Sequence, residues 1–389
     1  MSNLSLSILR TLVLICCLSA ASQLAAQNTV TGTLVSGGLT REYILYVPAI
    51  YTGNVAVPLI FNLHGYGSNN LEQLFYGDFR PIADTANFLM VLPNGTLDDQ
   101  NRRFWNTFLG NATVDDVAFI RDLLDTLQAN YNIDANRVYS TGMSNGGFMS
   151  YSLACDLNDR ITAIASVTGT MIQSKLNACN PARPVPVMEI HGTSDNVVPY
   201  NGQAGSTFVG IPALMSAWAG FNQCNPNPVI TQVPNTNTND GCTAERQLYF
   251  GGDWGSTVEH FKIVGGGHTW PGAAFNVGVT NQDISASKEI WRFFQQYNLN
   301  QFTATTQVPF TPEWSVYPNP VTDYLTLQSN NQQALKIVRV YDGTGRLIQS
   351  IAPSADAEIR IQTSTWLSGL YMLELKGTGR AQWLKVVKE

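Results

Sequence analysis

A serine in a glycine-rich context is the residue of this sequence best suited to carry chemistry. Ser144 lies in GMSNG at 142–146, between the strand-like segment 138–140 and the helix-like segment 148–154. Small residues in that position permit a tight strand-to-helix turn, which exposes the serine hydroxyl in front of a helix N-terminus. The context predicts a nucleophile elbow, although a bare GxSxG also occurs often by chance.

A serine hydroxyl needs a general base, and hydrolases of this kind order their triad as serine, acid, histidine. Asp195 follows the strand-like segment 185–190, and His268 follows the strand-like segment 258–264 and three glycines. We therefore predict Asp195 as the acid and His268 as the base. The plain alternatives are a turn cap for Asp195 and a surface loop histidine for His268.

Other histidines and acids are assigned structural roles. His260 lies inside a strand-like segment and is expected to pack. His191 directly precedes the loop that carries Asp195, here called the acid loop, so we expect it to hold that loop rather than to react. Asp253 and Asp283 are possible substitute acids, but neither directly follows a strand.

The segment LHGYG at 63–67 closes an early strand, where hydrolases with a nucleophile elbow place part of the oxyanion hole. We predict that the backbone N–H groups of Tyr66 and Asn145 donate to the oxygen that gains negative charge during acyl transfer. An ordinary glycine turn is the alternative, because backbone donors leave no side-chain signature.

The elements that must position these residues alternate along the chain. Strand-like segments such as 57–63, 88–92 and 137–140 end near glycine or proline, and 113–131 has helical spacing with Thr113 and Asp116 as a capping box. This alternation predicts an α/β domain over 27–297 with a mainly parallel sheet.

The composition changes after that domain. Residues 298–312 carry no charge and are rich in Gln, Thr and Pro, which is typical of a linker. Residues 313–389 then show short alternating strands, and Gly-Thr-Gly-Arg occurs at both 343–346 and 377–380, where hairpins need glycine. We predict a small all-β sandwich with strands at 324–327, 337–341, 358–361 and 370–375.

Length and charge exclude several classes of protein. The 389 residues suffice for about two domains. The balance of 22 Lys and Arg against 28 Asp and Glu, without a basic run, argues against nucleic acid as a partner.

Residues 1–26 contain Arg10, a short apolar run and then small residues, which is typical of a secretory signal peptide. The run is too short to span a bilayer, so no transmembrane segment is expected in the mature chain. Lipidation at Cys16 is the lesser alternative, because Ile15 stands where a small residue would be needed.

Export leaves four cysteines in an oxidising compartment, so two disulfides are expected. Three connectivities are possible among Cys155, Cys179, Cys224 and Cys242. We favour the pairs closest in sequence, Cys155 with Cys179 and Cys224 with Cys242, and four buried thiols are the alternative. The chain has no CxxC pair and only four scattered histidines, so no metal site is predicted.

Four segments together resemble the secreted α/β-hydrolases of the polyhydroxybutyrate depolymerase and feruloyl or acetylxylan esterase group. They are LHGYG at 63–67, GMSNGG at 142–147, HGTSDNVVPY at 191–200 and GGGHTWPG at 265–272. The resemblance extends over most of residues 30–297 and implies the α/β-hydrolase fold.

The same resemblance implies a triad of Ser144, Asp195 and His268 that needs no cofactor, and it suggests that Trp270 helps to line the substrate pocket. Trp105 is a further aromatic residue that could flank the site. This chain has Tyr66 where relatives often have a cysteine, so the packing there is expected to differ.

Residues 314–389 resemble the C-terminal sorting domain of the type IX secretion route, with YPNP at 317–320 and a basic end. The resemblance implies a secretion machinery as partner and an extracellular or surface location. A carbohydrate-binding or adhesive sandwich is the alternative.

We therefore predict a secreted serine carboxylic ester hydrolase that works through an acyl-enzyme. Plant cell-wall esters, feruloyl or acetyl esters of xylan, are favoured over polyhydroxyalkanoate polyesters, because nothing resembles a polyester-binding module. Since the base must be neutral, activity should fall below pH ~6.5. The alternatives are a serine peptidase of the same fold and a catalytically dead polysaccharide-binding protein.

Overall fold

The computed structural model describes residues 28–107, 113–202, 207–303, 314–329, 335–343, 346–353, 358–376 and 382–389. They form two compact units that divide the chain after Thr303. The predicted leader 1–26 lies outside the described residues, as does the predicted linker from residue 304 onward.

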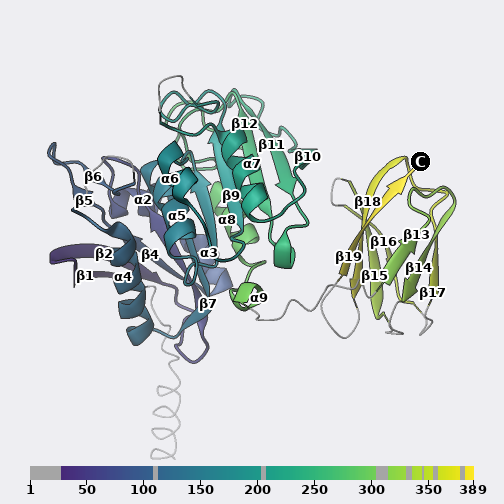
Figure 1. Ribbon diagram of the computed structural model, residues 1–389, viewed down its shortest axis with the longest axis horizontal. Coiled ribbons are helices and arrows are strands. Elements are labelled where there is room, and N and C mark those ends of the chain that lie inside the picture. The colour runs from purple at the N-terminus through teal and green to yellow at the C-terminus, as the bar shows by residue number, and fades with distance from the viewer. Residues whose placement is uncertain are drawn as a thin grey trace, which may run out of the picture. The chain divides into compact units, whose positions relative to one another are not determined.

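The first unit is built on a ten-stranded sheet (Figure 1). Its central strands are parallel and lie in the order β4 (Leu89–Pro93), β3 (Val57–Leu63), β7 (Ile133–Met143), β8 (Ala163–Val167), β9 (Val187–Gly192) and β12 (Val258–Val264). Antiparallel pairs extend the two edges: β2 (Leu39–Val47) with β1 (Asn28–Ser36), and β11 (Thr243–Tyr249) with β10 (Val229–Gln232). The predicted α/β fold with a mainly parallel sheet is confirmed.

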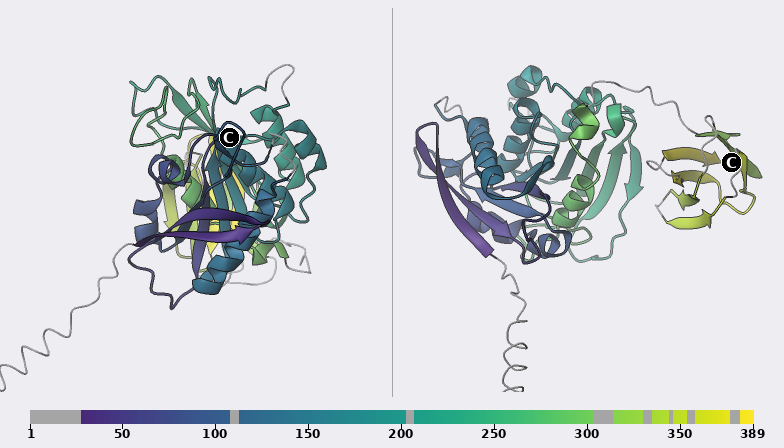
Figure 2. Two further views of the ribbon diagram at one scale, coloured as in Figure 1. Left: turned by 90° about the vertical axis from the view of Figure 1, so that its left-hand side faces the viewer. Right: turned by 90° about the horizontal axis from the view of Figure 1, so that it is seen from below.

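Helices cover both faces of this sheet (Figure 2). One core contains side chains from α4 (Asp116–Asn130), α5 (Asn145–Asp156), α6 (Gln173–Ala178) and α7 (Ile211–Phe221). The other contains side chains from α2 (Asn70–Tyr76), α3 (Arg80–Ala86), α8 (Ala286–Phe294) and α9 (Asn300–Thr303). Successive residues of β3 alternate between the cores, Leu59 and Phe61 facing the first and Ile60 the second, as a strand with two covered faces requires.

Short elements complete the first unit: the ribbon of β5 (Thr96–Leu97) and β6 (Arg103–Phe104), and the 3₁₀ turn η1 (Asp253–Gly255). Within the described part of the chain, no helix has both the length and the apolar character needed to cross a membrane.

Helix α4 begins differently from the prediction. Its N-cap is Asp115, whose carboxylate accepts the N–H of Ala118 at 2.9 Å, so the predicted capping box of Thr113 and Asp116 is wrong. The Asp116 carboxylate is buried and pairs with Arg41 at 2.7 Å. Because the Asp116 carboxylate compensates the buried Arg41 guanidinium, it does not cap the helix.

One of the two expected disulfides is present. Cys155 in α5 is bonded to Cys179 at the end of α6, whereas Cys224 and Cys242 are free and buried, so their predicted bond is wrong. Cys242 directly precedes the seven-residue strand β11, and Asn225, next to Cys224, donates its N–H to Phe250 beyond the far end of that strand. At ~3.3 Å per residue the two thiols are about 20 Å apart, too far for a disulfide.

The predicted linker 298–312 begins too early. Leu299 donates its N–H to the carbonyl of Asn136 at 2.8 Å, and Phe302 in α9 is buried in the second core of the first unit. Leu299 and Phe302 are both buried although the segment is mainly polar, and the first unit extends to Thr303.

The second unit consists of two antiparallel sheets around one core, which confirms the predicted β-sandwich. One sheet contains β13 (Trp314–Tyr317), β14 (Tyr324–Ser329) and β17 (Glu358–Gln362), and the other β16 (Leu347–Ile351), β15 (Ile337–Asp342), β18 (Gly369–Lys376) and β19 (Gln382–Lys388). The pairs β15–β16 and β18–β19 flank the two Gly-Thr-Gly-Arg segments. The second of these segments, 377–380, lies outside the described residues.

Candidate active site

Ser144 lies at the sharp turn between β7 and α5, with φ 52° and ψ −118°. This conformation is strained for a residue with a side chain. Its N–H donates to the carbonyl of Val167 at the end of β8, at 2.8 Å, which fixes the turn. Glycine is required on both sides of the turn because the chain there passes very close to β3. A Cβ at Gly146 would lie 2.2 Å from the Leu63 carbonyl oxygen, and a Cβ at Gly142 would lie 2.6 Å from the same oxygen.

His268 and Asp195 come together from the loops after β12 and β9. His268 Nδ1 lies 2.7 Å from Asp195 Oδ2, and Asp195 Oδ1 accepts the N–H groups of Val197 and Val198, both at 2.8 Å. The His268 side chain is 18% exposed and lines the same cavity as Ser144. The structure thus brings the three residues of the predicted triad to one site.

A second histidine lies behind the acid. His191, on β9, is completely buried, with Nδ1 3.0 Å from Glu189 Oε1 and Nε2 3.3 Å from Asp195 Oδ2. Burial raises the pKa of Asp195, but hydrogen bonds from His191 and His268 outweigh it and hold that pKa well below its usual range. Asp195 is therefore an ionised carboxylate, as a partner for an imidazolium must be.

The loop predicted to form part of the oxyanion hole, residues 64–67 and here called the oxyanion loop, follows β3 and runs beside the turn at Ser144. A Cβ added to Gly65 would lie 3.5 Å from the Ser144 Cβ, so the chain at 65–66 passes directly along the serine. Among the described residues, neither the Tyr66 nor the Asn145 backbone N–H has an acceptor. Two unused donors beside a serine are what a developing oxyanion requires.

A neutral network supports this loop. His64 is buried, and its two ring nitrogens contact the carbonyl of Gly65 at 2.7 Å and the N–H of Gly95 at 3.0 Å. Burial lowers the pKa of His64 to about 4. Because Nε2 accepts the amide of Gly95, the proton of the neutral ring resides on Nδ1.

Trp105 belongs to the same network and not to the substrate pocket. It is fully buried, and its indole N–H donates to the His64 carbonyl at 2.9 Å. Its backbone N–H donates to the Asn145 side-chain oxygen at 2.7 Å, and that amide donates back to the Trp105 carbonyl at 3.1 Å. The predicted substrate contact of Trp105 is wrong, because the indole is buried against His64 while the Trp105 backbone bonds Asn145 at the start of α5.

Trp270 is likewise buried, against Phe79, and its indole N–H donates to Ser287 at 3.2 Å. Its backbone N–H donates to the Tyr76 hydroxyl at 3.1 Å. The prediction that its side chain lines the pocket is therefore wrong. Trp270 instead supports the wall that Tyr76 forms.

The cavity at Ser144 measures about 470 Å³ and is mainly apolar. Its aromatic walls come from the oxyanion loop, from the end of α2 and from the loop after Trp270: Tyr66, Phe75, Tyr76 and Phe275. The rings of Tyr76 and Phe275 lie 5.2 Å apart. Sequence reasoning missed Phe75, Tyr76 and Phe275, whose only signal was their position shortly after the LHGYG and GGGHTWPG segments.

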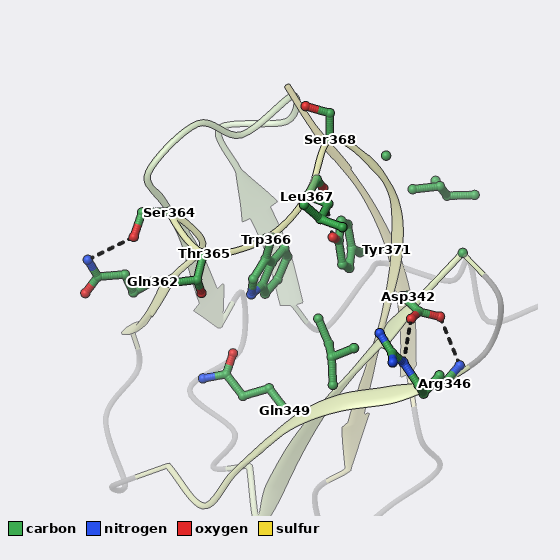
Figure 3. A pocket seen from close by; sticks show the side chains of 14 residues that line it. Asp342, Arg346, Gln349, Gln362, Ser364, Thr365, Trp366, Leu367, Ser368 and Tyr371 are labelled. Carbon is green, nitrogen blue, oxygen red and sulfur yellow. Dashed lines mark hydrogen bonds and ion pairs between the residues drawn. The ribbon is translucent and has the colours of Figure 1, made fainter.

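A larger cavity of about 870 Å³ lies in the second unit (Figure 3). Figure 3 shows Trp366, Leu367 and Tyr371 along it, together with the ion pair of Asp342 and Arg346 at 3.0 Å. All four histidines of the chain precede residue 269, so this cavity has no imidazole base. The smaller cavity is the candidate active site.

The remaining candidates lie elsewhere. His260 is buried on β12 and contacts the Tyr200 hydroxyl at 3.0 Å, in keeping with the predicted packing role. Asp283 accepts the backbone N–H groups of Thr236 and Asn237, so it does not replace Asp195. No group of potential metal ligands occurs in the part of the chain that the structure describes.

Comparison with known proteins identifies relatives of both units. Residues 110–209 match a family model described as Phospholipase/Carboxylesterase, and residues 315–389 match one described as Secretion system C-terminal sorting domain. The second match supports export of the chain.

The chain is 29% identical over 238 residues to Feruloyl esterase B of Piromyces equi, covering 59% of this chain and 42% of that protein. It is 29% identical over 261 residues to Probable feruloyl esterase C of Aspergillus niger, covering 65% and 83%. The chain thus spans less than half the length of the first of these relatives.

Among solved structures, an acetyl xylan esterase from Aspergillus awamori is similar with a TM-score of 0.50 and 13% identity, over 68% of this chain and 99% of that one. This likeness confirms the fold. Together with the family models and the relatives, it also confirms the resemblance to α/β-hydrolase esterases.

Proposed function

We propose that the protein is an exported serine carboxylesterase that hydrolyses plant cell-wall esters, with an aromatic acyl group such as feruloyl in the cavity at Ser144. The observation that carries the proposal is the lining of one apolar cavity by Ser144 and His268, with Asp195 2.7 Å behind the imidazole. The relatives named feruloyl esterase and the sorting-domain match support the substrate class and the export.

The chemistry follows from these positions. Asp195 holds His268 by Nδ1–H, which leaves Nε2 to accept the proton of Ser144 as Oγ attacks the ester carbonyl carbon. The backbone N–H groups of Tyr66 and Asn145 donate to the resulting oxyanion. Collapse expels the alcohol, which takes the proton from His268, and water then attacks the acyl-enzyme by the same route to release the acid.

The cavity favours a flat aromatic acyl group over acetyl. Its volume of about 470 Å³ greatly exceeds that of an acetyl group, and its walls are rings and apolar side chains. Aromatic rings bind an aromatic ligand through stacked or edge contacts that an acetyl group cannot make. Ser68 and Glu72 at the cavity add polar atoms suited to a phenolic hydroxyl.

The test measures hydrolysis of methyl ferulate, acetylated xylan, polyhydroxybutyrate film, short p-nitrophenyl esters and a peptide panel by wild type and Ser144→Ala. We expect methyl ferulate to give the highest kcat/KM and Ser144→Ala to lose about 10⁴-fold or more. Ser194→Ala, an exposed serine beside Asp195, is the matched control and should retain activity. Full activity in Ser144→Ala, or a preference for peptides, would overturn the proposal.

A further inference from the structure

We propose that His191 is a positioning residue of this esterase, a buried cation that holds the Asp195 carboxylate in place for His268. The inference rests on the proposed function and extends the triad by one layer. The geometry that carries it is a continuous buried chain: Glu189 Oε1, His191 Nδ1, His191 Nε2, Asp195 Oδ2 and His268 Nδ1, with separations of 3.0, 3.3 and 2.7 Å across its three contacts.

His191 also fixes the backbone of the acid loop. Its Nε2 lies 2.8 Å from the carbonyl of Val198, whose N–H donates to Asp195 Oδ1. A single imidazole therefore contacts both the carboxylate and the loop that carries it. Side chains of Glu189, His191 and Asp195 are all 0% exposed, so water cannot replace these bonds.

The groups facing His191 from every packed element explain its charge. They are Glu189 on its own strand, Asp195 on the following loop, Tyr151 of α5 acting through Glu189 Oε2 at 2.8 Å, the ring of Tyr200 at 6.0 Å, His260 of β12, and His268 beyond Asp195. Only the two carboxylates are acidic enough to pair with it. Burial lowers the pKa of His191, but hydrogen bonds and charge from Asp195 and Glu189 outweigh burial and raise it to about 9.

A cation at this position has a definite electrostatic effect. It stabilises ionised Asp195, and it also partly offsets the attraction that Asp195 exerts on protonated His268. Removing the cation should therefore make His268 easier to protonate. Replacing a residue with a purely packing role would not change how readily His268 is protonated.

The experiment compares His191→Gln with wild type in pH profiles of kcat/KM on the best ester of the panel. Glutamine keeps a donor for the acid loop but cannot carry charge. We expect the acid limb to move to higher pH by about half a pH unit or more. His191→Ala, which loses donor and charge, should lower kcat about 100-fold with little change in KM, because His191 does not line the cavity.

His260→Gln is the matched control. His260 is an equally buried histidine on the adjacent strand that contacts the Glu189 backbone carbonyl at 3.0 Å but not Asp195. It should destabilise the fold without moving the acid limb. Equal shifts of the acid limb in both variants, or none in His191→Gln, would overturn the proposal.

A measurement on the unmodified ring covers the case in which the variants do not fold. Histidine-selective ¹⁵N NMR of the full chain and of Ser144→Ala should show one imidazolium that persists above pH 7.5, lost in His191→Gln if that variant folds. Absence of any such imidazolium would refute the proposal even in an active enzyme. Lack of ester turnover with the imidazolium present would instead refute only the proposed function.

Discussion

Two buried histidines, His64 and His191, follow or lie on strands on either side of β7, which leads to Ser144. One is neutral and the other is a cation. His64, at the start of the loop after β3, has both ring nitrogens bonded to backbone groups, and burial lowers its pKa to about 4. His191, under the acid loop, lies between two carboxylates that raise its pKa to about 9. Histidine is therefore a neutral hydrogen-bonding residue at the oxyanion loop and a cation at the loop that carries Asp195.

In the proposed mechanism, the difference matches what each side does during acyl transfer. Negative charge would develop at the oxyanion, where we propose that the uncharged backbone N–H groups of Tyr66 and Asn145 act as preoriented donors. Positive charge develops on His268, which needs an ionised carboxylate, and a buried carboxylate needs compensation of its own. Burial is common to both sites, so the neighbouring carboxylates decide the charge of each histidine.

The largest expected effect comes from removing the charge of the acid. Asp195→Asn keeps size and the bonds from Val197 and Val198 but cannot stabilise protonated His268. We expect kcat to fall about 10⁴-fold with KM little changed. Steady-state kinetics on methyl ferulate checks this. Asp283→Asn is the control, because Asp283 accepts the backbone N–H groups of Thr236 and Asn237, and a comparable loss there would mean that the acid is misassigned.

The second prediction concerns stability, because the two histidines should act in opposite pH ranges. His64 binds protons less readily folded than unfolded, so its contribution to the free energy of unfolding is lost as pH falls from ~6.5 towards 4, by about 3 kcal/mol. His191 binds protons more readily folded, so its contribution is present below pH ~6.5 and is lost as pH rises towards 9.

Urea unfolding of wild type, His64→Gln and His191→Gln between pH 4.5 and 9 tests both signs. His64→Gln should reduce the loss of stability on the acid side, and His191→Gln should reduce the loss on the alkaline side. His260, buried and with its pKa lowered to about 3, adds to the acid effect in all three proteins. A variant that reduces the loss on the wrong side would contradict the contrast between the two histidines.

The sequence predicted what depends on local pattern and chain order. The strand at 258–264 coincides with β12, the helix at 113–131 contains α4, and the turn at Ser144 has the strand before it and the helix after it that were expected. Glycine positions such as Gly146 are informative because a close approach of the backbone excludes every other residue.

The sequence could not predict contacts between remote segments. The separation of Cys224 from Cys242 depends on β11 running between them, and the burial of Trp105 depends on its bonds to His64 and Asn145. The pairing of Tyr76 with Phe275 in the cavity wall joins residues about 200 positions apart. The polar composition of residues 298–303 likewise gave no sign of α9, in which Phe302 is buried in the second core.

The smallest expected effect concerns Tyr66, in the oxyanion loop that neutral His64 supports. Its hydroxyl donates to Asp98 Oδ2 at 2.5 Å, and the Arg102 guanidinium lies 4.6 Å from its ring centroid. The next residue, Gly67, donates its N–H to the Arg103 carbonyl at 2.8 Å. The β5–β6 ribbon therefore holds the oxyanion loop through one side chain and one backbone bond.

Tyr66→Phe removes the first of these bonds and leaves the backbone donor and the ring in place. Because the backbone bond of Gly67 still holds the loop, we expect kcat to fall only about threefold to tenfold, which corresponds to one modest hydrogen bond. A double-mutant cycle with Asp98→Ala provides the control. Non-additive effects on kcat would show that the two residues act together on the loop, whereas independent effects would mean that the ring of Tyr66 acts only as a cavity wall.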